Sequence, residues 1–377
     1  MTRTTYLDYN ASAPIRPQAA AAVGHALTLT GNASSVHGFG RRARACLEDA
    51  REVVAALVNA PPATVVFTGG GTEANNLALH GLAHDRRVLI SAGEHPSVLG
   101  AVEGAARIPL GPDGSIDLAR LAEMLASDAR PALVSVMLAN NETGVIQPVE
   151  AVVALARRHG ALVHCDAVQA VGKIAVDMAA MGVDALSLSA HKIGGPQGVG
   201  ALVAAESLTL TPLLRGGGQE RRRRAGTENV PGIAGFATAA ELAISENADA
   251  LRIAVLRDDL EQRLRALAPE VKVIGAAAPR LPNTSCLAVV GLTAETVVMG
   301  LDLAGVAVSA GSACSSGKVS PSHVLRAMGL GEAEAEAAIR VSLGWASGPA
   351  DVDHFLQAWG KLYARCTTAR RPQNSAA

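Results

Sequence analysis

The sequence predicts an α/β fold with a mainly parallel sheet, and three observations lead to that prediction. Short apolar runs alternate with longer stretches in which apolar residues recur at helical spacing. Strands separated by helices usually run parallel, because the chain has to cross back before the next strand begins. The chain has 377 residues, of which 49% are hydrophobic, and this is enough to bury a large core.

The individual elements follow this alternation. Arg41–Asn59 carries apolar residues at positions 46, 50, 53 and 57, and this spacing predicts a helix. The predicted buried strands of this region are Thr64–Phe67, Val88–Ser91, Leu133–Leu138, Ala161–Cys165, Asp184–Ser189 and Gly200–Ala204. Two further helices are predicted over Val149–His159 and Val230–Asn247.

A second unit is predicted to begin near residue 250, after the last of these helices. It contains a predicted helix over Leu251–Leu267, two strands and further helices. We therefore expect a large domain over residues 15–250 and a smaller α+β domain over residues 251–377. Residues 1–14 are expected to form a segment that packs with the smaller domain.

The composition argues against several classes of function. The net charge is −1, from 33 basic and 34 acidic side chains, so no overall field favours nucleic acid or an anionic membrane. Aromatic residues make up only 2%, which argues against a stacking surface for single-stranded nucleic acid. The run Arg221–Arg224 is interpreted as a solvated face or a contact between subunits. We therefore expect neither nucleic acid nor a membrane as a partner.

Cysteine usage and the first residues predict the compartment. The five cysteines are scattered without a C-x-x-C pair, which argues against a disulfide framework and a structural zinc site. No bound metal is therefore predicted. The first residues lack the apolar stretch of a signal peptide, and no apolar run is long enough to cross a bilayer. These observations together predict a cytoplasmic protein.

A glycine-rich turn between a strand and a helix is the first candidate site. Residues 69–72 read Gly-Gly-Gly-Thr, directly after the predicted strand Thr64–Phe67. Free backbone N–H groups and the positive end of a helix dipole favour a phosphate at such a turn, and Thr72 adds a hydroxyl donor. An ordinary tight connection between a strand and a helix is the alternative.

Two charged residues follow predicted strands at the edge where open α/β sheets bind ligands. Asp166 at such a position can pair with a pyridinium nitrogen, although it can also cap a helix. Lys192, one of only five lysines, follows the strand Asp184–Ser189, and desolvation there favours an uncharged amine for Schiff-base chemistry. A lysine that extends from the strand end into solvent is the alternative. His164 and Asp166 should point to one face of their strand, and Cys165 to the other, apolar face.

The remaining candidates are a cysteine and an arginine of the second unit. Cys314 lies among small residues in Gly311–Gly317, a setting that predicts an exposed loop and suits a reactive thiol. An adventitious surface cysteine is the alternative. Arg340 lies inside an apolar stretch, where its guanidinium would bind a substrate's α-carboxylate or form an internal salt bridge.

Together these segments resemble the cysteine desulfurases of the NifS/IscS type, within the class-V aminotransferase family. The resemblance runs from Tyr6 almost to Ser347. The motifs that carry it are Tyr6–Ala11 (YLDYNA), Gly31–His37 (GNASSVH), Gly71–Asn76 (GTEANN), Glu94–His95 (EH), Ala139–Gly144 (ANNETG), His164–Gln169 (HCDAVQ), Ser189–Lys192 (SAHK), Gly217–Glu220 (GGQE), Ala225–Asn229 (AGTEN), Pro282–Thr284 (PNT), Gly311–Gly317 (GSACSSG) and Arg340.

The resemblance implies the fold-type-I architecture of pyridoxal-phosphate enzymes, with a mainly parallel seven-stranded sheet in the large domain and a homodimeric assembly. It implies that Lys192 binds pyridoxal 5′-phosphate covalently and that Asp166 contacts the pyridine nitrogen. Gln169 would contact the phenolic oxygen, and His95 would stack on the ring. The residues implied to hold the phosphate are Gly71, Thr72, Ser189 and His191, with Thr227 reaching it from the neighbouring subunit.

The activity that the resemblance implies is removal of sulfur from L-cysteine, which leaves L-alanine and a persulfide on Cys314. Asn141 and Arg340 would hold the substrate carboxylate, while Lys192 and His95 would move protons. The sulfur acceptor would be an iron–sulfur scaffold or another protein, and Cys314 could contact an iron–sulfur cluster during transfer. A selenocysteine lyase, a class-V transaminase and a non-enzymatic sulfur carrier are the alternatives.

Overall fold

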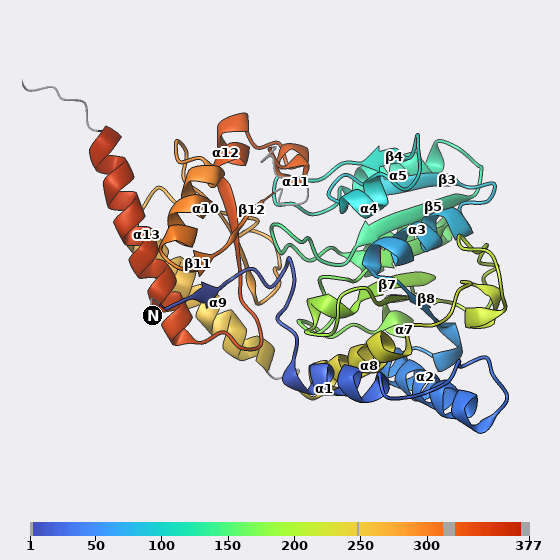
Figure 1. Cartoon of the computed structure of the whole chain (residues 1–377). Coiled ribbons are helices and arrows are strands. Elements are labelled where there is room, and N and C mark those ends of the chain that lie inside the picture. Colours follow the sequence, from blue (N-terminus) through green and yellow to red (C-terminus); the bar gives the residue numbers. More distant parts are fainter. Residues whose placement is uncertain (1–2, 247–248, 312–320, 371–377) are drawn as a thin grey trace, which may run out of the picture.

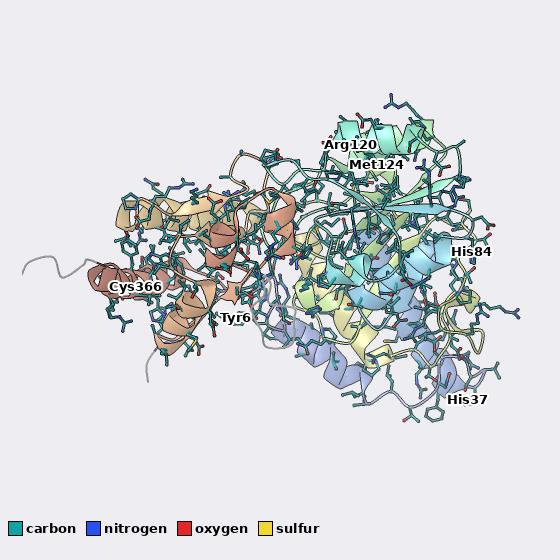
Figure 2. All side chains as sticks on the ribbon, turned by 90° about the horizontal axis from the view of Figure 1, so that it is seen from above. Tyr6, His37, His84, Arg120, Met124 and Cys366 are labelled. Carbon is teal, nitrogen blue, oxygen red and sulfur yellow. The ribbon has the colours of Figure 1, made fainter. Side chains whose placement is uncertain are left out.

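The protein consists of two units, each built on its own β-sheet (Figure 1). The computed structural model describes residues 3–246, 249–311 and 321–370. Viewed from above, His84 and Arg120 lie on the first unit, and Cys366 lies on the second, well away from them (Figure 2). None of the helices in the described ranges has both the length and the apolar character needed to cross a membrane.

The first unit contains a seven-stranded sheet with the strand order β2-β8-β7-β6-β5-β3-β4. The strands are β2 Val65–Thr68, β3 Arg87–Ser91, β4 Ala106–Ile108, β5 Ala132–Met137, β6 Leu162–Asp166, β7 Ala185–Ser189 and β8 Gly200–Ala204. Strand β8 runs antiparallel to both neighbours, whereas the other neighbouring pairs are parallel. The predicted mainly parallel seven-stranded sheet is therefore confirmed.

Helices cover both faces of this sheet, because side chains alternate between the faces along each strand. Val65 and Phe67 pack into a core with helices α2, α5, α6 and α8, whereas Val66 packs against α3 on the opposite face. The helices of the first unit are α1 Pro17–Ala26, α2 Gly38–Ala56, α3 Gly71–Leu82, α4 Pro96–Leu99, α5 Leu118–Ala126, α6 Val149–Arg158, α7 Met178–Met181 and α8 Val230–Ser245. Short 3₁₀ turns lie at Pro62–Thr64, Ala190–Lys192 and Gln219–Arg222.

The second unit contains a four-stranded antiparallel sheet with the strand order β12-β13-β10-β9. Its strands are β9 Lys272–Ile274, β10 Thr284–Ala288, β12 Ser309–Ala310 and β13 Ala338–Ser342. Its helices are α9 Asp249–Leu267, α10 Ala294–Leu303, α11 His323–Ala327, α12 Glu332–Ala337 and α13 Pro349–Arg370. A separate core of residues from α9, α10, α13 and the sheet stabilises this unit.

The N-terminal segment joins the two units. Strand β1 (Thr5–Tyr6) pairs in parallel with β11 (Val306–Ala307), and Leu7 is buried in the core of the second unit. The chain then crosses to α1 of the first unit (Figure 1). On these contacts we propose a segment over residues 1–14, a large domain over 15–250 and a small domain over 251–377.

Several predicted boundaries differ from the observed ones by a few residues. Helix α2 begins at Gly38 rather than at Arg41, because the His37 side chain accepts a hydrogen bond from the Gly40 N–H and caps the helix. Strand β6 extends to Asp166, one residue further than predicted. Lys192 lies in a 3₁₀ turn that follows β7 directly.

Candidate functional site

A cavity at the carboxyl ends of β5, β6 and β7 collects most of the predicted site residues. It encloses about 630 Å³, part of which is open to solvent. Its lining includes Gly71, Thr72, His95, Asn141, Asp166, Gln169, Ser189, His191 and Lys192, which the sequence predicted, and Asn75, Ser97, Met137, Ala139 and Val168, which it did not. We call this space the cofactor cavity. Of the other predicted residues, Thr227 and Arg340 do not line it, and Cys314 lies outside the described residues.

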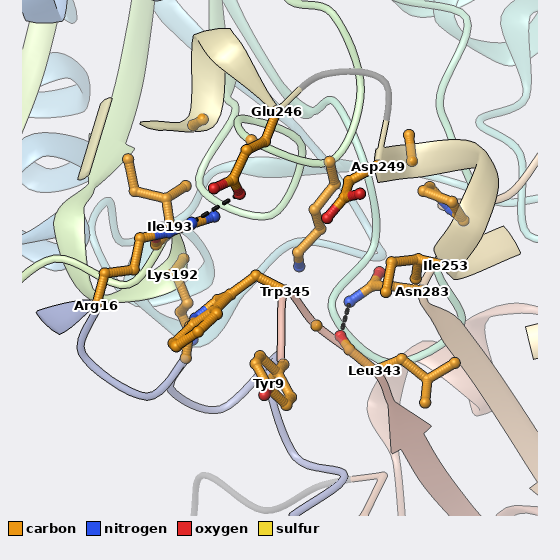
Figure 3. A pocket seen from close by; sticks show the side chains of 17 residues that line it. Tyr9, Arg16, Lys192, Ile193, Glu246, Asp249, Ile253, Asn283, Leu343 and Trp345 are labelled. Carbon is orange, nitrogen blue, oxygen red and sulfur yellow. Dashed lines mark hydrogen bonds and ion pairs between the residues drawn. The ribbon is translucent and has the colours of Figure 1, made fainter. Parts of the chain in front are cut away.

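A second cavity lies on the other side of Lys192, between the two units (Figure 3). It also encloses about 630 Å³, and Lys192 lines both cavities. On one of its walls Arg16 stacks over the ring of Trp345 at 5.1 Å and forms a 2.7 Å ion pair with Glu246. Lys192 therefore borders two cavities.

The glycine turn forms the start of helix α3 at one end of the cofactor cavity. Gly70 has φ = 148°, a backbone conformation that favours glycine, and a Cβ there would point into open space. A Cβ at Gly71 would lie 2.9 Å from Val168 Cγ2, so the narrow cradle excludes a side chain. The backbone N–H groups of the first helical turn have no partners within the helix. The turn can therefore bind an anion such as a phosphate.

Asp166 lies at the end of β6, with its carboxylate in the floor of the cavity. Its Oδ1 accepts a hydrogen bond from the Val168 N–H at 2.9 Å, and its Oδ2 accepts one from Asn75 Nδ2 at 2.7 Å. No helix starts at this point of the described chain, so the helix-cap alternative does not apply. As predicted, Cys165 points to the opposite face, where it is buried in the apolar core.

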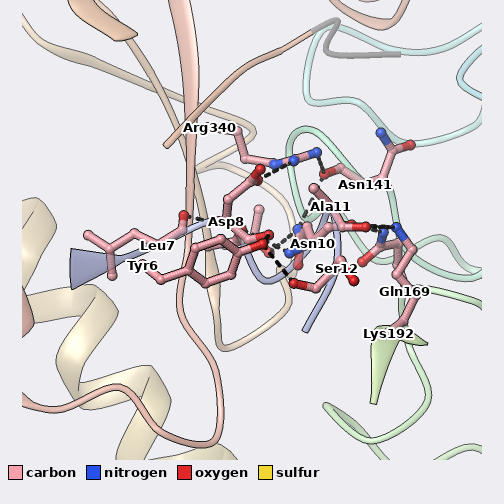
Figure 4. Close-up of polar contacts among 12 residues, drawn as sticks. Tyr6, Leu7, Asp8, Asn10, Ala11, Ser12, Asn141, Gln169, Lys192 and Arg340 are labelled. Carbon is pink, nitrogen blue, oxygen red and sulfur yellow. Dashed lines mark hydrogen bonds and ion pairs between the residues drawn. The ribbon is translucent and has the colours of Figure 1, made fainter. Parts of the chain in front are cut away.

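Lys192 is held by backbone carbonyls of the N-terminal segment (Figure 4). Its Nζ donates to Asn10 O at 2.6 Å and to Ala11 O at 2.9 Å. The alternative of a lysine that extends into solvent is therefore wrong, because the N-terminal segment crosses over the strand end and covers the amine. An amine in this place can form a Schiff base with an aldehyde in the cofactor cavity.

Two histidines of the cavity are held in the uncharged form. Burial lowers the pKa of His95, and the nearby Lys192 lowers it further against the opposing effect of Asp166. The Ser97 N–H donates to His95 Nδ1 at 3.1 Å, so the ring proton of the neutral form is on Nε2. Burial and Lys192 together lower the pKa of His191 to about 4. Both shifts favour the neutral form of the ring, which can accept a proton.

Arg340 lies on β13 at the border between the two units. Its Nη2 forms a 2.6 Å ion pair with Asp8 Oδ1, and its Nη1 donates to Asn141 O at 3.0 Å. The Nε atom is buried and has no hydrogen-bond partner among the described residues. The internal salt bridge, one of the two alternatives for Arg340, is therefore present. The bond to Asn141 places the guanidinium beside the cofactor cavity, and Nε remains available for a ligand.

Glu142 lies beneath both described ends of the segment that contains Cys314. Its Oε2 accepts a hydrogen bond from Ser322 Oγ at 2.5 Å, and a Cβ on Gly311 would lie 3.1 Å from the same oxygen. Burial raises the pKa of Glu142 to about 7, although Ser322 and Arg340 act in the opposite direction. The carboxyl group is thus a titratable contact at the base of this segment.

This raised pKa leads to a prediction about stability. Between pH 4.5 and 7 the folded protein keeps a proton on Glu142 that the unfolded chain has released, so rising pH lowers the free energy of unfolding. Within this window Glu142 lowers the free energy of unfolding by at most about 1.4 kcal/mol per pH unit. Above pH 7 it adds no further dependence on pH. E142Q should therefore flatten the dependence of urea-unfolding free energy on pH in this window. E123Q, at an exposed glutamate, is the control. Equal slopes for E142Q and the unmodified protein would contradict the prediction.

Asp166 provides a second prediction, on activity. Among the described residues, Asp166 carries the only carboxylate that lines the cofactor cavity. We expect D166A to lower kcat by roughly 10²-fold, as when one electrostatic partner of a reacting group is removed. It also leaves Asn75 Nδ2 and the Val168 N–H without this acceptor, which costs about 1–3 kcal/mol of stability. D184A is the matched control, because Asp184 accepts from the Val163 N–H at 2.7 Å just before β7, outside the cavity lining. Urea unfolding should show a loss of stability for both variants, whereas steady-state kinetics should show a loss of kcat for D166A alone. Equal losses of kcat in the two variants would contradict the role assigned to Asp166.

Sequence reasoning missed several residues that shape the site. Asn75 holds Asp166, Asn10 accepts from Lys192, and Lys173 contacts Asn10 and Gln169. Glu94 is buried, and burial together with Asp166 raises its pKa well above the usual range. The sequence did carry a signal for three of these residues, because Asn10 lies in the motif at residues 6–11, Asn75 in that at 71–76 and Glu94 in that at 94–95. Lys173 lies outside every motif, and only its rarity as one of five lysines marked it.

Comparisons with known proteins agree with this geometry. A profile of the family described as aminotransferase class-V matches residues 5–355. The chain belongs to the class-V aminotransferase family. A cysteine desulfurase of Cereibacter sphaeroides is 46% identical to this class-V chain, over 93% of the chain and 94% of the relative. An IscS-like cysteine desulfurase of Mycobacterium tuberculosis is 42% identical, over 97% of each.

Solved structures show the same relationship. A NifS-like protein from Rickettsia africae matches with a TM-score of 0.90 and 34% identity, over 96% of this chain and all of that one. The predicted NifS/IscS-type resemblance and the fold-type-I architecture are therefore confirmed. This class-V chain is an enzyme that uses pyridoxal 5′-phosphate. Its cavity fits that group, with an anion cradle at Gly71 and Thr72, a carboxylate at Asp166 and an amine at Lys192.

Proposed function

We propose that this enzyme is a cysteine desulfurase, which removes sulfur from L-cysteine and leaves L-alanine and a persulfide on Cys314. The observation that carries the proposal is the convergence of three groups on one cavity. The Lys192 amine, the Asp166 carboxylate and the open start of helix α3 all line the cofactor cavity. The relatives named cysteine desulfurases, which match along nearly the whole chain, support the same activity.

The cofactor, when bound, withdraws electrons from the substrate Cα and makes its proton acidic. Lys192 would hold it covalently, with Asp166 at the pyridine nitrogen, Gln169 at the phenolic oxygen and His95 over the ring. The residues proposed to hold its phosphate are Gly71, Thr72, Ser189 and His191, together with Thr227 of the neighbouring subunit. In support, Thr227 is exposed and lies outside the cavity of its own chain, so it is accessible to a second copy.

The remaining steps are proposed for the chain's own groups. Arg340 and Asn141 orient the substrate by its carboxylate, for which Arg340 Nε, unpaired within the described part of the chain, is a suitable donor. Lys192 takes the proton from the substrate Cα. The Cys314 thiolate then attacks the substrate sulfur, so that a sulfur–sulfur bond forms while the carbon–sulfur bond breaks. His95 takes up the proton that the Cys314 thiol loses when it becomes a thiolate. The protonated ring then returns a proton to the carbon that becomes the methyl group of alanine.

The proposed partners are a second copy of the chain and a protein that accepts the sulfur. Exposed apolar side chains near α1 and α2 (Leu27, Val36 and Phe39) support a homodimer, because such groups are usually covered in an assembly. An iron–sulfur scaffold or another thiolation protein would take the persulfide sulfur, and Cys314 could contact an iron–sulfur cluster during transfer. We also propose a cytoplasmic location.

An assay of the purified protein tests this function. It should be yellow, and with L-cysteine and a thiol reductant it should produce alanine and sulfide in equal amounts without any 2-oxo acid. A class-V transaminase would need a 2-oxo acid, and a selenocysteine lyase would act on selenocysteine in strong preference to cysteine. A colourless protein, or alanine formed only with a 2-oxo acid, would refute the proposal.

A further inference from the structure

A hydrogen-bonded network around Asn10 includes residues that line the cofactor cavity and residues that line the second cavity. Lys173 Nζ donates to Gln169 Oε1 at 2.6 Å and to Asn10 Oδ1 at 2.7 Å. Gln169 Nε2 donates to Asn10 O at 2.9 Å, the same carbonyl that accepts from Lys192. Gln169 lines the first cavity and Lys173 the second. Lys173 has no role in the proposed mechanism, but only two hydrogen bonds, both to Asn10, separate it from Lys192, which has one.

The network fixes which edge of the Gln169 carboxamide faces the cofactor cavity. An amide has an oxygen and an NH₂ group of nearly the same shape, so its hydrogen-bond partners decide its orientation. The carbonyl of Asn10 can only accept, and it therefore binds Nε2. The Lys173 amine donates to Oε1 and keeps this oxygen turned away. The second Nε2 proton remains available for a group in the cofactor cavity.

The contacts of Lys173 are also unusual for a lysine. Its side chain is partly exposed to the second cavity, but its amine is enclosed, and both partners in the network are neutral amides. Burial, followed by the positive charges of Lys192 and Arg340, lowers the pKa of Lys173 well below 10.5. The amine donates one hydrogen bond to each of these two acceptors. The other charged groups that face this region are Arg16, Glu246 and Asp249 of the second cavity.

We propose that Lys173 is a positioning residue, which holds the Gln169 carboxamide with its donor edge toward the cofactor. This inference rests on the proposed role of Gln169 at the phenolic oxygen. A donor at that oxygen stabilises its negative charge, so the Lys192–cofactor linkage loses its proton at a lower pH. Without Lys173, the amide is held on one side only, and the linkage keeps its proton to a higher pH.

The test is an absorbance titration of the yellow holoenzyme against pH. K173M should move the midpoint of the colour change upward by about 0.5 to 1 pH unit, the scale expected when one hydrogen bond to a charged group weakens. K361M, at an exposed lysine on α13, should titrate like the unmodified protein. In a Q169L background, adding K173M should produce no further shift, because Lys173 acts through Gln169.

The outcomes separate this inference from the proposed function. A K173M holoenzyme with an unchanged midpoint overturns the inference, as does an equal additional shift in the Q169L background, while alanine and sulfide production by the unmodified protein still stands. If the unmodified protein fails to bind the cofactor, the proposed function fails instead. If K173M does not fold, K173Q, which is too short to reach both acceptors with an amine, carries the same expectation.

Discussion

Replacing Lys192 with alanine should lower desulfurase activity by at least about 10³-fold, the largest loss that we expect from any single change in the cofactor cavity. The variant loses the covalent attachment of the cofactor and the group that takes the proton from the substrate, and proton transfer alone accounts for about 10²–10⁴-fold. Steady-state production of alanine and sulfide measures the loss. Gel filtration followed by absorbance measures how much cofactor remains bound.

The control for this variant is K361A, because Lys361 is an exposed lysine of α13 and contacts neither cavity. Borohydride reduction of the unmodified holoenzyme, followed by peptide mapping, should place the cofactor on Lys192. Lys173 is the other amine of the network, so the mapping distinguishes the two lysines directly. Cofactor attached to Lys173, or activity of K192A within tenfold of normal, would show that Lys192 has been assigned the wrong role.

Changing Cys314 to alanine should reduce sulfide release to below about one hundredth of normal while leaving the yellow colour in place. Cys314 lies outside the described residues, and its role rests on the sequence and on the unsuitability of three of the other four cysteines. Burial raises the pKa of three of the other thiols, which disfavours the reactive thiolate. These are Cys46, Cys165, whose pKa is raised well above its usual range, and Cys286, whose pKa is raised to about 12.

Cys366 provides the matched control for this experiment. It is partly buried on α13 of the second unit (Figure 2), and C366A should release sulfide at the normal rate. Mass spectrometry after brief exposure to L-cysteine should find one extra sulfur atom on the Cys314 peptide. An extra sulfur on another cysteine, or normal sulfide release by C314A, would remove Cys314 from the mechanism.

Much of the first unit could be predicted from local pattern. The strands β5 to β8 were predicted within one residue at most of their ends, because strands that are buried on both faces of a sheet are short apolar runs. Helix α5 and the edge strand β4 were not predicted. β4 has three residues, two of them exposed, so its sequence has little apolar pattern to detect.

The candidate site was predicted where each residue carries a local sign of its chemistry. The glycine turn, Asp166 and Lys192 each follow a strand, and parallel strands bring their carboxyl ends to one edge of the sheet. Asn10 and Lys173 carry no such sign. Asn10 is 182 residues from the lysine it contacts, and nothing in the local pattern of a loop asparagine indicates which amine its carbonyl will accept.

The sequence alone determined the α/β class, the mainly parallel sheet and most of the candidate residues that line the cofactor cavity, because apolar periodicity and motif order are local properties of the chain. Only the tertiary structure decided that the N-terminal segment covers Lys192, that Arg340 pairs with Asp8 and that Lys173 contacts Gln169. These contacts depend on how two separately packed units meet, with the N-terminal segment crossing between them. Their hydrogen-bond partners are far apart in the chain or leave no periodic pattern, and they are therefore set by packing rather than by local sequence.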